Sequence, residues 1–281
     1  MSLVPFWRSG RFTQWWGARE YFHLGEGLAL TRLKSSQFIF VDPLEESVCA
    51  KLIARGVWER QTTKVVLSLL QAGDHVVEVG AHVGYYTLAM ALKVGRTGSV
   101  TSLEANPRLA SLAERTLRFN GCAGWAHVMR KAASDVAGPV RFSISRQFGG
   151  GGHLYVWDGA LGDDTEILEV DAVRLDDLDM PPPRLIRLDA EGSEILILRG
   201  AERLLARKDV VLCMEWDVIQ MASRGDPDAF ANWLADKGFR FWRIQTNSRL
   251  VGVATADLAT TPRCDLVIAR SPTFLPSKLR A

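Results

Sequence analysis

The sequence has few cysteines, no long apolar run and almost no net charge, and each of these absences excludes a class of protein. The four cysteines, Cys49, Cys122, Cys213 and Cys264, lie far apart and match neither a CxxC metal pair nor the disulfide framework of a small secreted domain. No stretch approaches the ~18 consecutive apolar residues of a membrane span, and the N-terminus lacks the apolar core of a signal peptide. We therefore expect a protein of the reducing cytoplasm that does not span a membrane.

The charge balance is close to neutral, with 34 Lys and Arg residues against 32 Asp and Glu residues. A protein dedicated to nucleic acid usually carries a strongly basic face, so we expect no nucleic-acid partner. With 281 residues, of which 47% are apolar, the chain can bury a sizeable core without support from disulfides or metal ions.

From about residue 61 onward, short apolar runs alternate with stretches of helical periodicity. The strand candidates are residues 75–80, 99–103, 126–129, 184–188, 210–215, 239–244 and 264–269. The helix candidates are residues 62–70, 85–93, 108–120, 194–207 and 228–237. This alternation predicts an α/β fold with a mostly parallel sheet that is covered by helices on both faces. The last two strand candidates are joined without a helix, which predicts an antiparallel final strand.

Two segments fall outside this alternation. Residues 1–60 show only weak β-like alternation, so we expect a small β-rich appendage in front of a domain of residues 61–281. Its start holds Trp7, Trp15 and Trp16 close to several arginines, and such a cluster is typical of an interface, which leaves a homodimer open. Residues 133–183 contain short β-like runs and four consecutive glycines at 149–152, which predicts an inserted β hairpin or lid.

A glycine-containing loop follows the first strand of the alternating part. The strand ends in Glu78 and Gly80, and Gly84 precedes an apolar helix, so the backbone can turn tightly and approach a ligand at the helix N-terminus. A dinucleotide-binding loop more typically reads G-x-G-x-x-G in order to hold a pyrophosphate. Because an acid stands at the first position here, the loop favours a cationic nucleoside ligand without phosphate, such as S-adenosylmethionine (SAM).

Glu104 lies at the expected end of the next strand, about one βα unit after the glycine loop. A carboxylate at this position can accept hydrogen bonds from both ribose hydroxyls of an adenosine. This residue supports a nucleoside cofactor but does not separate SAM from NAD, so a nicotinamide-dependent oxidoreductase remains an alternative.

Together these motifs resemble those of the FkbM family of class I SAM-dependent methyltransferases. The resemblance is carried by residues 56–63, 78–87, 103–107, 186–194 and 198–201. It implies a Rossmann-like class I methyltransferase sheet, SAM as the cofactor, and O-methylation of a hydroxyl on a small molecule, sugar or natural product. A catalytically silent SAM-binding or scaffold protein is an alternative of a different class.

The expected cofactor site follows from the same motifs. We expect the cofactor to contact the glycine loop and the ends of the neighbouring strands at Glu78, Gly80, Ala81, His82, Gly84, Tyr85, Glu104, Ala105, Asn106 and Asp189. The resemblance implies that Glu59 and Thr62 close the pocket from above. Family members commonly carry asparagine at the position of His82, so this residue would alter the contacts to the methionine moiety.

Acidic residues also follow the ends of two later strand candidates. Asp189, Glu191, Glu215 and Asp217 should face the methyl group, because ligands of an open α/β sheet lie outside the carboxyl ends of its strands. We expect Asp189 to orient or deprotonate the acceptor hydroxyl, with Glu191 and Glu215 as further candidates. Asp189, Glu215 and Asp217 could instead hold Mg²⁺, although no other signature supports a metal. His153, which follows the glycine run, could act as a base brought in by loop closure.

Overall fold

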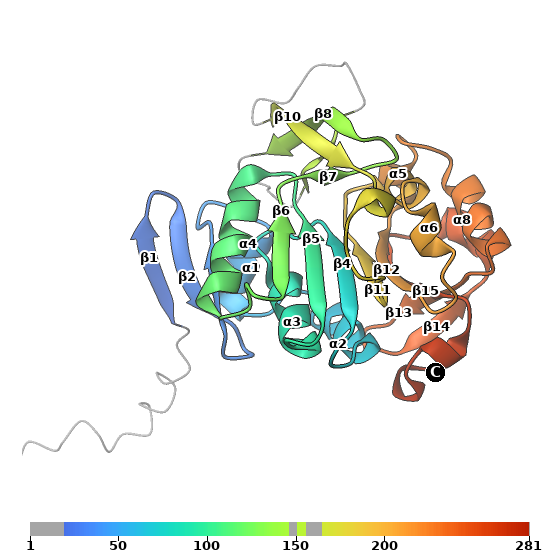
Figure 1. The fold of residues 1–281 in the computed structure, drawn as a ribbon, viewed down its shortest axis with the longest axis horizontal. Coiled ribbons are helices and arrows are strands. Elements are labelled where there is room, and N and C mark those ends of the chain that lie inside the picture. Colours follow the sequence, from blue (N-terminus) through green and yellow to red (C-terminus); the bar gives the residue numbers. More distant parts are fainter. Residues whose placement is uncertain (1–19, 146–150, 156–164, 281) are drawn as a thin grey trace, which may run out of the picture.

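The computed structural model describes residues 20–145, 151–155 and 165–280, so the tryptophans at 7, 15 and 16 lie outside the described residues, as does half of the glycine run. In these ranges the largest sheet has eight strands (Figure 1), in the order β14 (Leu250–Val253), β13 (Arg240–Ile244), β15 (Cys264–Ala269), β12 (Val211–Trp216), β11 (Leu185–Leu188), β4 (His75–Val79), β5 (Ser99–Leu103) and β6 (Ala126–Met129). The five strands from β12 to β6 are parallel. The final strand, β15, runs antiparallel to both of its neighbours. The predicted fold class is therefore confirmed.

Helices cover both faces of this sheet. One face carries α1 (Val48–Arg55), α2 (Arg60–Leu69), α3 (Tyr85–Val94) and α4 (Pro107–Phe119), and the other carries α5 (Glu194–Arg199), α6 (Glu202–Leu205), α7 (Val218–Met221) and α8 (Pro227–Asp236). Alternate strand residues face opposite sides: Val76 lies in the core of the first face and Val77 in the core of the second. Short 3₁₀ turns at Leu175–Asp177, Thr255–Thr260, Pro272–Phe274 and Ser277–Leu279 complete the described chain.

The segment in front of the large sheet forms a three-stranded antiparallel sheet of β1 (Tyr21–Gly25), β2 (Leu28–Arg32) and β3 (Phe38–Val41). Ala29, Ile39 and Val41 are fully buried and belong to the same apolar core as the helices of the first face. Thr116 Oγ1 on α4 accepts a hydrogen bond from the backbone N–H of Phe40 at 3.1 Å. The small sheet therefore shares its core with the main fold.

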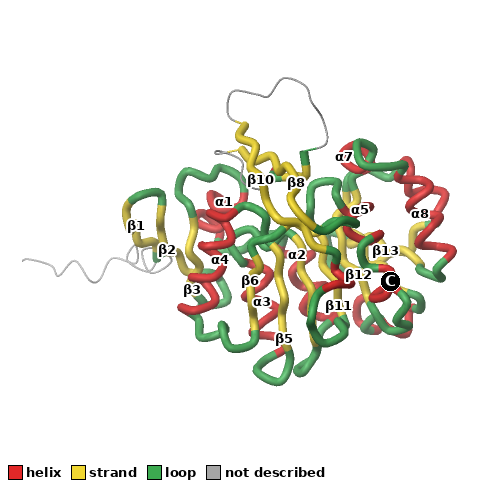
Figure 2. The backbone as a smooth tube through the Cα atoms, turned by 45° about the horizontal axis from the view of Figure 1, so that its top comes forward, coloured by secondary structure: helices red, strands yellow, loops and turns green. Residues whose placement is uncertain are grey.

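A second small sheet lies over the carboxyl ends of β5 and β6 (Figures 1 and 2). It consists of β7 (Ala132–Ala133), β8 (Gly138–Ser145), β9 (His153–Leu154) and β10 (Thr165–Val173), in the order β7-β10-β8-β9. β8 pairs antiparallel with β10 over the whole length of β8, as expected for an inserted hairpin. This insertion sheet has a small apolar core of its own.

Two local predictions were wrong. Residues 194–207 form two short helices instead of one, and the break lies at Gly200, where an added Cβ would sit 2.1 Å from the carbonyl oxygen of Ser134. Asp176 holds the break: its N–H donates to the Gly200 carbonyl oxygen at 3.0 Å, and its carboxylate accepts hydrogen bonds from the N–H groups of Arg203 and Leu204 at the start of α6. Strand β14 was not predicted, because it is short and its central residues, Val251 and Gly252, are exposed. Among the described residues, no helix has the length and apolar character needed to cross a bilayer.

Candidate active site

The cavity of interest opens at the carboxyl ends of β4 and β11. The chain runs outward from β4 to β5 and β6, and then returns to the other side of β4 as β11. In open α/β sheets, ligands bind at such a switch in strand order. The cavity there measures about 410 Å³, a size typical of sites for small molecules.

The two glycines of the predicted loop have different roles. Gly80 borders the cavity with φ +85°, and an added Cβ would lie 1.9 Å from the carbonyl oxygen of Asp189. Gly84 also has φ +85°, but its neighbour is Ala113 of α4, whose Cα would lie 3.0 Å from an added Cβ. Gly80 thus allows the ends of β4 and β11 to meet at the cavity, whereas Gly84 allows α3 and α4 to pack closely.

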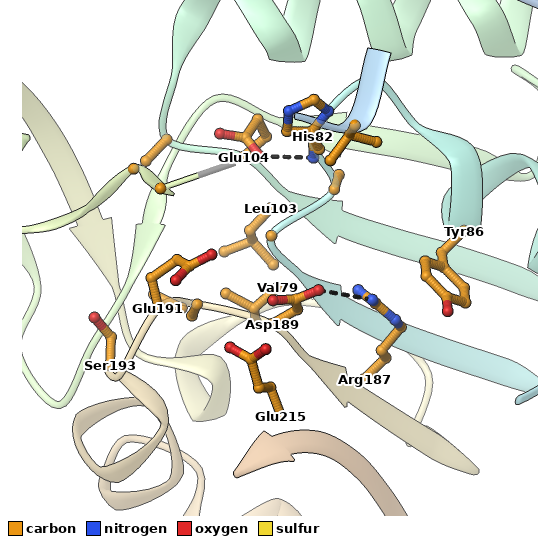
Figure 3. Close-up of a pocket in the computed structure, with 18 of the residues that line it drawn as sticks. Val79, His82, Tyr86, Leu103, Glu104, Arg187, Asp189, Glu191, Ser193 and Glu215 are labelled. Atoms are coloured by element: carbon orange, nitrogen blue, oxygen red, sulfur yellow. Dashed lines mark hydrogen bonds and ion pairs between the residues drawn. The ribbon is translucent and has the colours of Figure 1, made fainter. Parts of the chain in front are cut away.

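Glu104 lies in the cavity wall, where its carboxylate faces the loop (Figure 3). Its Oε2 accepts a hydrogen bond from the backbone N–H of His82 at 2.7 Å, and its Oε1 accepts one from the N–H of Asn106 at 2.9 Å. Burial raises the pKa of Glu104 to about 7, although these two N–H groups oppose the shift. Each carboxylate oxygen can accept a second hydrogen bond, so the group remains able to receive a pair of ribose hydroxyls.

Of the residues that flank the glycine loop and Glu104, some line the cavity and one only supports the backbone. Ala81 and Ala105 line the cavity, as does Tyr85, whose ring packs edge-on against Tyr86. Asn106 is not part of the wall: its side chain caps the start of α4 by accepting hydrogen bonds from the N–H groups of Arg108 and Leu109. Asn106 therefore contributes by fixing the backbone that follows Glu104.

His82 lies in the wall with φ +51°. Both of its ring nitrogens are buried and have no hydrogen-bond partner among the described residues. Burial lowers the pKa of His82, an effect that Glu45 and Asp189 oppose. With both ring nitrogens buried, the ring does not present a donor or an acceptor to a ligand in the cavity.

Glu78 does not line the cavity. Its side chain is fully buried, and its Oε2 accepts hydrogen bonds from Thr87 Oγ1 at 2.5 Å and from Ser102 Oγ at 2.7 Å. The reason is the strand pleat, because Glu78 lies on the same face of β4 as Val76, which belongs to the core. The structure therefore places this acid beneath the loop, where it holds α3 and β5, and not in contact with the cavity.

Arg187 is a wall residue that the sequence analysis did not single out. Its Nη2 lies 2.9 Å from Asp189 Oδ2, and its Nη1 lies 3.6 Å from Glu78 Oε1. The guanidinium carbon lies 3.7 Å from the centre of the Tyr86 ring. Burial alone would lower the pKa of Arg187, but Asp189, Tyr86 and Glu78 raise it. The side chain is therefore a buried cation that links the loop strand to the strand of Asp189. Arg187 could have been found from the sequence, because it lies two residues before Asp189 and residues two apart in an extended chain point to the same side.

The segment before α2 forms another part of the wall, with Ser47, Val48, Lys51, Trp58 and Glu59. Glu59 Oε2 accepts a hydrogen bond from the Tyr86 hydroxyl at 3.0 Å. Burial, Asp265 and Asp189 raise the pKa of Glu59 to about 7. Thr62 does not reach the cavity, because its hydroxyl donates to Asp265 Oδ2 at 2.5 Å.

Three carboxylates meet at the side of the cavity formed by β11 and β12 (Figure 3). Asp189, Glu191 and Glu215 each place an oxygen within 4.8 Å of the others. Each also has a partner: Arg187 for Asp189, Gln220 Nε2 for Glu191 at 2.5 Å, and Arg263 Nε for Glu215 at 2.6 Å. Burial, Asp189 and Glu191 raise the pKa of Glu215 to about 8, and burial and Asp189 also raise that of Glu191.

Two further candidates lie apart from this trio. Asp217 caps α7, where its Oδ1 accepts hydrogen bonds from the N–H groups of Ile219 and Gln220. The ring of His153 does not line the cavity, and its Nδ1 lies 2.8 Å from the carbonyl oxygen of Gly151. The next residue, Leu154, does line it, because successive strand residues point to opposite faces.

The chain is similar to known methyltransferases in sequence and in structure. The FkbM methyltransferase domain matches residues 78–241. A stretch of 49 residues is 43% identical to protein-L-isoaspartate O-methyltransferase of Caenorhabditis elegans and covers 17% of this chain and 22% of that protein. The solved structure of methyltransferase FkbM from Methylobacillus flagellatus KT is 16% identical, with a TM-score of 0.45 over 69% of this chain and 43% of that chain. The O-methyltransferase from Bacillus cereus in complex with S-adenosylhomocysteine (SAH) is 16% identical, with a TM-score of 0.45 over 78% of this chain and 84% of that chain.

The strand order and the position of the cavity at the switch in that order define a Rossmann-like sheet. The family match covers more than half of the chain, so the protein belongs to the FkbM methyltransferase domain family. The match to the curated relative, in contrast, spans less than a quarter of that protein's length.

Proposed function

We propose that this protein is a SAM-dependent methyltransferase that methylates a hydroxyl oxygen of a small molecule, sugar or natural product. One observation carries the proposal: the trio of Asp189, Glu191 and Glu215 shares a cavity with Glu104. One end of the cavity can thus hold an adenosine ribose, while the other can receive an acceptor hydroxyl and its proton.

The residues of the wall suit SAM. Glu104 can accept the ribose hydroxyls, and Gly80 leaves the backbone open where a side chain would collide with Asp189. Five acidic residues line the cavity, namely Glu59, Glu104, Asp189, Glu191 and Glu215, against four basic ones, namely Lys51, Lys131, Arg187 and Arg263. The small excess of acids supports a cationic donor over a pyrophosphate. When bound, SAM supplies a methyl group on a positively charged sulfur.

Asp189 and Glu215 can have different roles toward the acceptor: Asp189 orients its hydroxyl, and Glu215 accepts the proton. Asp189 is paired with Arg187 through Oδ2, which leaves Oδ1 free to accept a hydrogen bond from the acceptor hydroxyl and orient it. Glu215 has a pKa of about 8, raised by burial, Asp189 and Glu191, which suits a general base that works near neutral pH. In this proposal Glu215 would accept the proton of the acceptor hydroxyl, and Asp189 would orient the acceptor oxygen toward the methyl group that SAM would supply.

This mechanism needs no step that uses Mg²⁺. Two of the three clustered carboxylates are in direct contact with arginines, Arg187 and Arg263, and these cations would have to leave before a divalent ion could share the same oxygens. Asp217, the third ligand considered from sequence, is engaged at the start of α7.

We further propose that residues 61–281 form the methyltransferase domain, with residues 133–183 as an insertion. The described part of the segment in front, residues 20–60, completes this domain, because it shares the apolar core and because Ser47, Lys51 and Glu59 contribute to the cavity wall.

Calorimetry with SAM, SAH and NAD tests the cofactor. We expect SAM and SAH to bind and NAD not to bind, and the reverse pattern would overturn the proposal. SAH release from SAM should then be measured across a panel of sugars, phenols and aliphatic alcohols. An Asp189→Asn variant should keep the wild-type affinity for SAH and lose most of the turnover, whereas unchanged turnover would remove Asp189 from the mechanism.

A further inference from the structure

The insertion sheet supplies one wall of the cavity, at the side of Glu104. Phe142 on β8 and Leu154 on β9 line the cavity together with Ala105 and Ala132. These four residues belong to one small apolar cluster that is separate from the two main cores. Phe142 and Leu154 are only 8% and 6% exposed, so the wall is already packed.

The position of this wall is fixed by pairing and by a tether. Phe142 and Leu154 are direct cross-strand partners, which places their side chains on the same face of the sheet. Gly152 allows the chain to pass beside the ring, because an added Cβ would lie 3.0 Å from Phe142 Cε1. Arg224, which follows α7, donates a hydrogen bond from Nη2 to the carbonyl oxygen of Leu154 at 2.8 Å. The short strand β9 is thus held from two sides.

The two ends of the cavity differ in chemistry. Asp189, Glu191 and Glu215 crowd together at the ends of β11 and β12. Ala105 directly follows Glu104, and Ala132 lies just after β6, so the apolar wall begins at the proposed ribose carboxylate. A purine base is attached to the ribose, and its flat faces gain most from aromatic and aliphatic contacts.

We propose that Phe142 and Leu154 cover the base of the adenosyl donor, so that the insertion acts as a cofactor-recognition element and not as an acceptor lid. This inference rests on the proposed function, because it requires an adenosyl ligand held at Glu104. It assigns the acceptor end to the strands of the main sheet and to the segment of Ser47, Lys51 and Trp58.

The test is calorimetry with two probes, SAH and adenosine, on wild-type protein and on Phe142→Ala. Contacts between a base and an aromatic ring are worth about 1–3 kcal/mol, so we expect the variant to bind both probes about 5- to 150-fold more weakly. The factor should be the same for both probes, because they share the base. Phe142→Leu preserves most of the apolar packing and should fold even if the alanine variant does not; it should still weaken both probes severalfold.

Ile144→Ala is the matched control. Ile144 lies on the same strand and packs on the same apolar cluster, but it does not line the cavity. It should cost folding stability while leaving both affinities within twofold of wild type. Wild-type affinity in both Phe142 variants, or a loss for SAH without a loss for adenosine, would overturn the inference. If wild-type protein binds neither probe, the proposed function itself fails.

Discussion

Replacing Arg187 by methionine tests the buried ion-pair network most directly. Arg187 is 4% exposed and is shared between Asp189 and Glu78, and Glu78 Oε1 has no hydrogen-bond partner among the described residues. Breaking a buried pair by removing one partner costs about 3–5 kcal/mol. For a domain of this size, that corresponds to a decrease of roughly 10 °C in the unfolding midpoint.

The stability lost in Arg187→Met should increase with pH. Burial raises the pKa of Glu78, and Arg187 opposes that shift, so the methionine variant should raise the pKa further. A carboxyl group whose pKa is higher in the folded state stabilises the fold while it is protonated, and that stability disappears as the pH rises through the folded-state value. The deficit of Arg187→Met should therefore be larger at pH 8 than at pH 5.

Thermal unfolding followed by circular dichroism measures both effects. Arg118→Met is a suitable control, because Arg118 forms an exposed pair with Glu114 at 3.1 Å, and such pairs contribute about 1 kcal/mol or less. Adding Glu78→Gln to the Arg187 variant should restore part of the stability, since the glutamine carries no charge. The reasoning is refuted if Arg187→Met unfolds at the same temperature as Arg118→Met, or if its deficit grows toward acidic pH.

Two further predictions concern the loop and the base. Gly80→Ala should destabilise the fold by about 3 kcal/mol or abolish SAH binding, because the new Cβ would lie 1.9 Å from the carbonyl oxygen of Asp189; denaturant unfolding and calorimetry measure this, and a stable variant with wild-type affinity would contradict it. Once an acceptor is known, the methyl-transfer rate should rise with pH through about 8, since burial, Asp189 and Glu191 raise the pKa of Glu215 to that value. Glu215→Gln should remove this step from the profile, and an unchanged profile would exclude Glu215 as the base.

The fold was largely predictable because every strand of the main sheet except β14 is a compact apolar run between turn signals. The helix at 194–207 was less predictable, since its break is held by hydrogen bonds from Asp176, a residue distant in sequence, to Gly200 and to the start of α6. Strand β14 was not predicted, because its two central residues are exposed and give little hydrophobic signal.

The residues of the candidate site were predictable where an acidic side chain directly follows the end of a predicted strand. Glu104, Asp189, Glu191 and Glu215 all line the cavity, as the topology of an open sheet requires. The direction of Glu78 was not readable, because it depends on which face of β4 meets Thr87 and Ser102. Wall residues from other segments, such as Lys51, Phe142 and Arg263, depend on tertiary packing, and no local motif marks them.

The wall of the cavity is assembled from segments that extend along the chain from Ser47 to Arg263. Such a binding site cannot survive in a partly unfolded chain, so any compound that occupies it must shift the folding equilibrium as a whole. A compound present at about 100 times its dissociation constant would add about 2.7 kcal/mol of stability. Libraries of unmodified natural products could therefore be screened by differential scanning fluorimetry in the presence of SAH, before any methylated product has been seen.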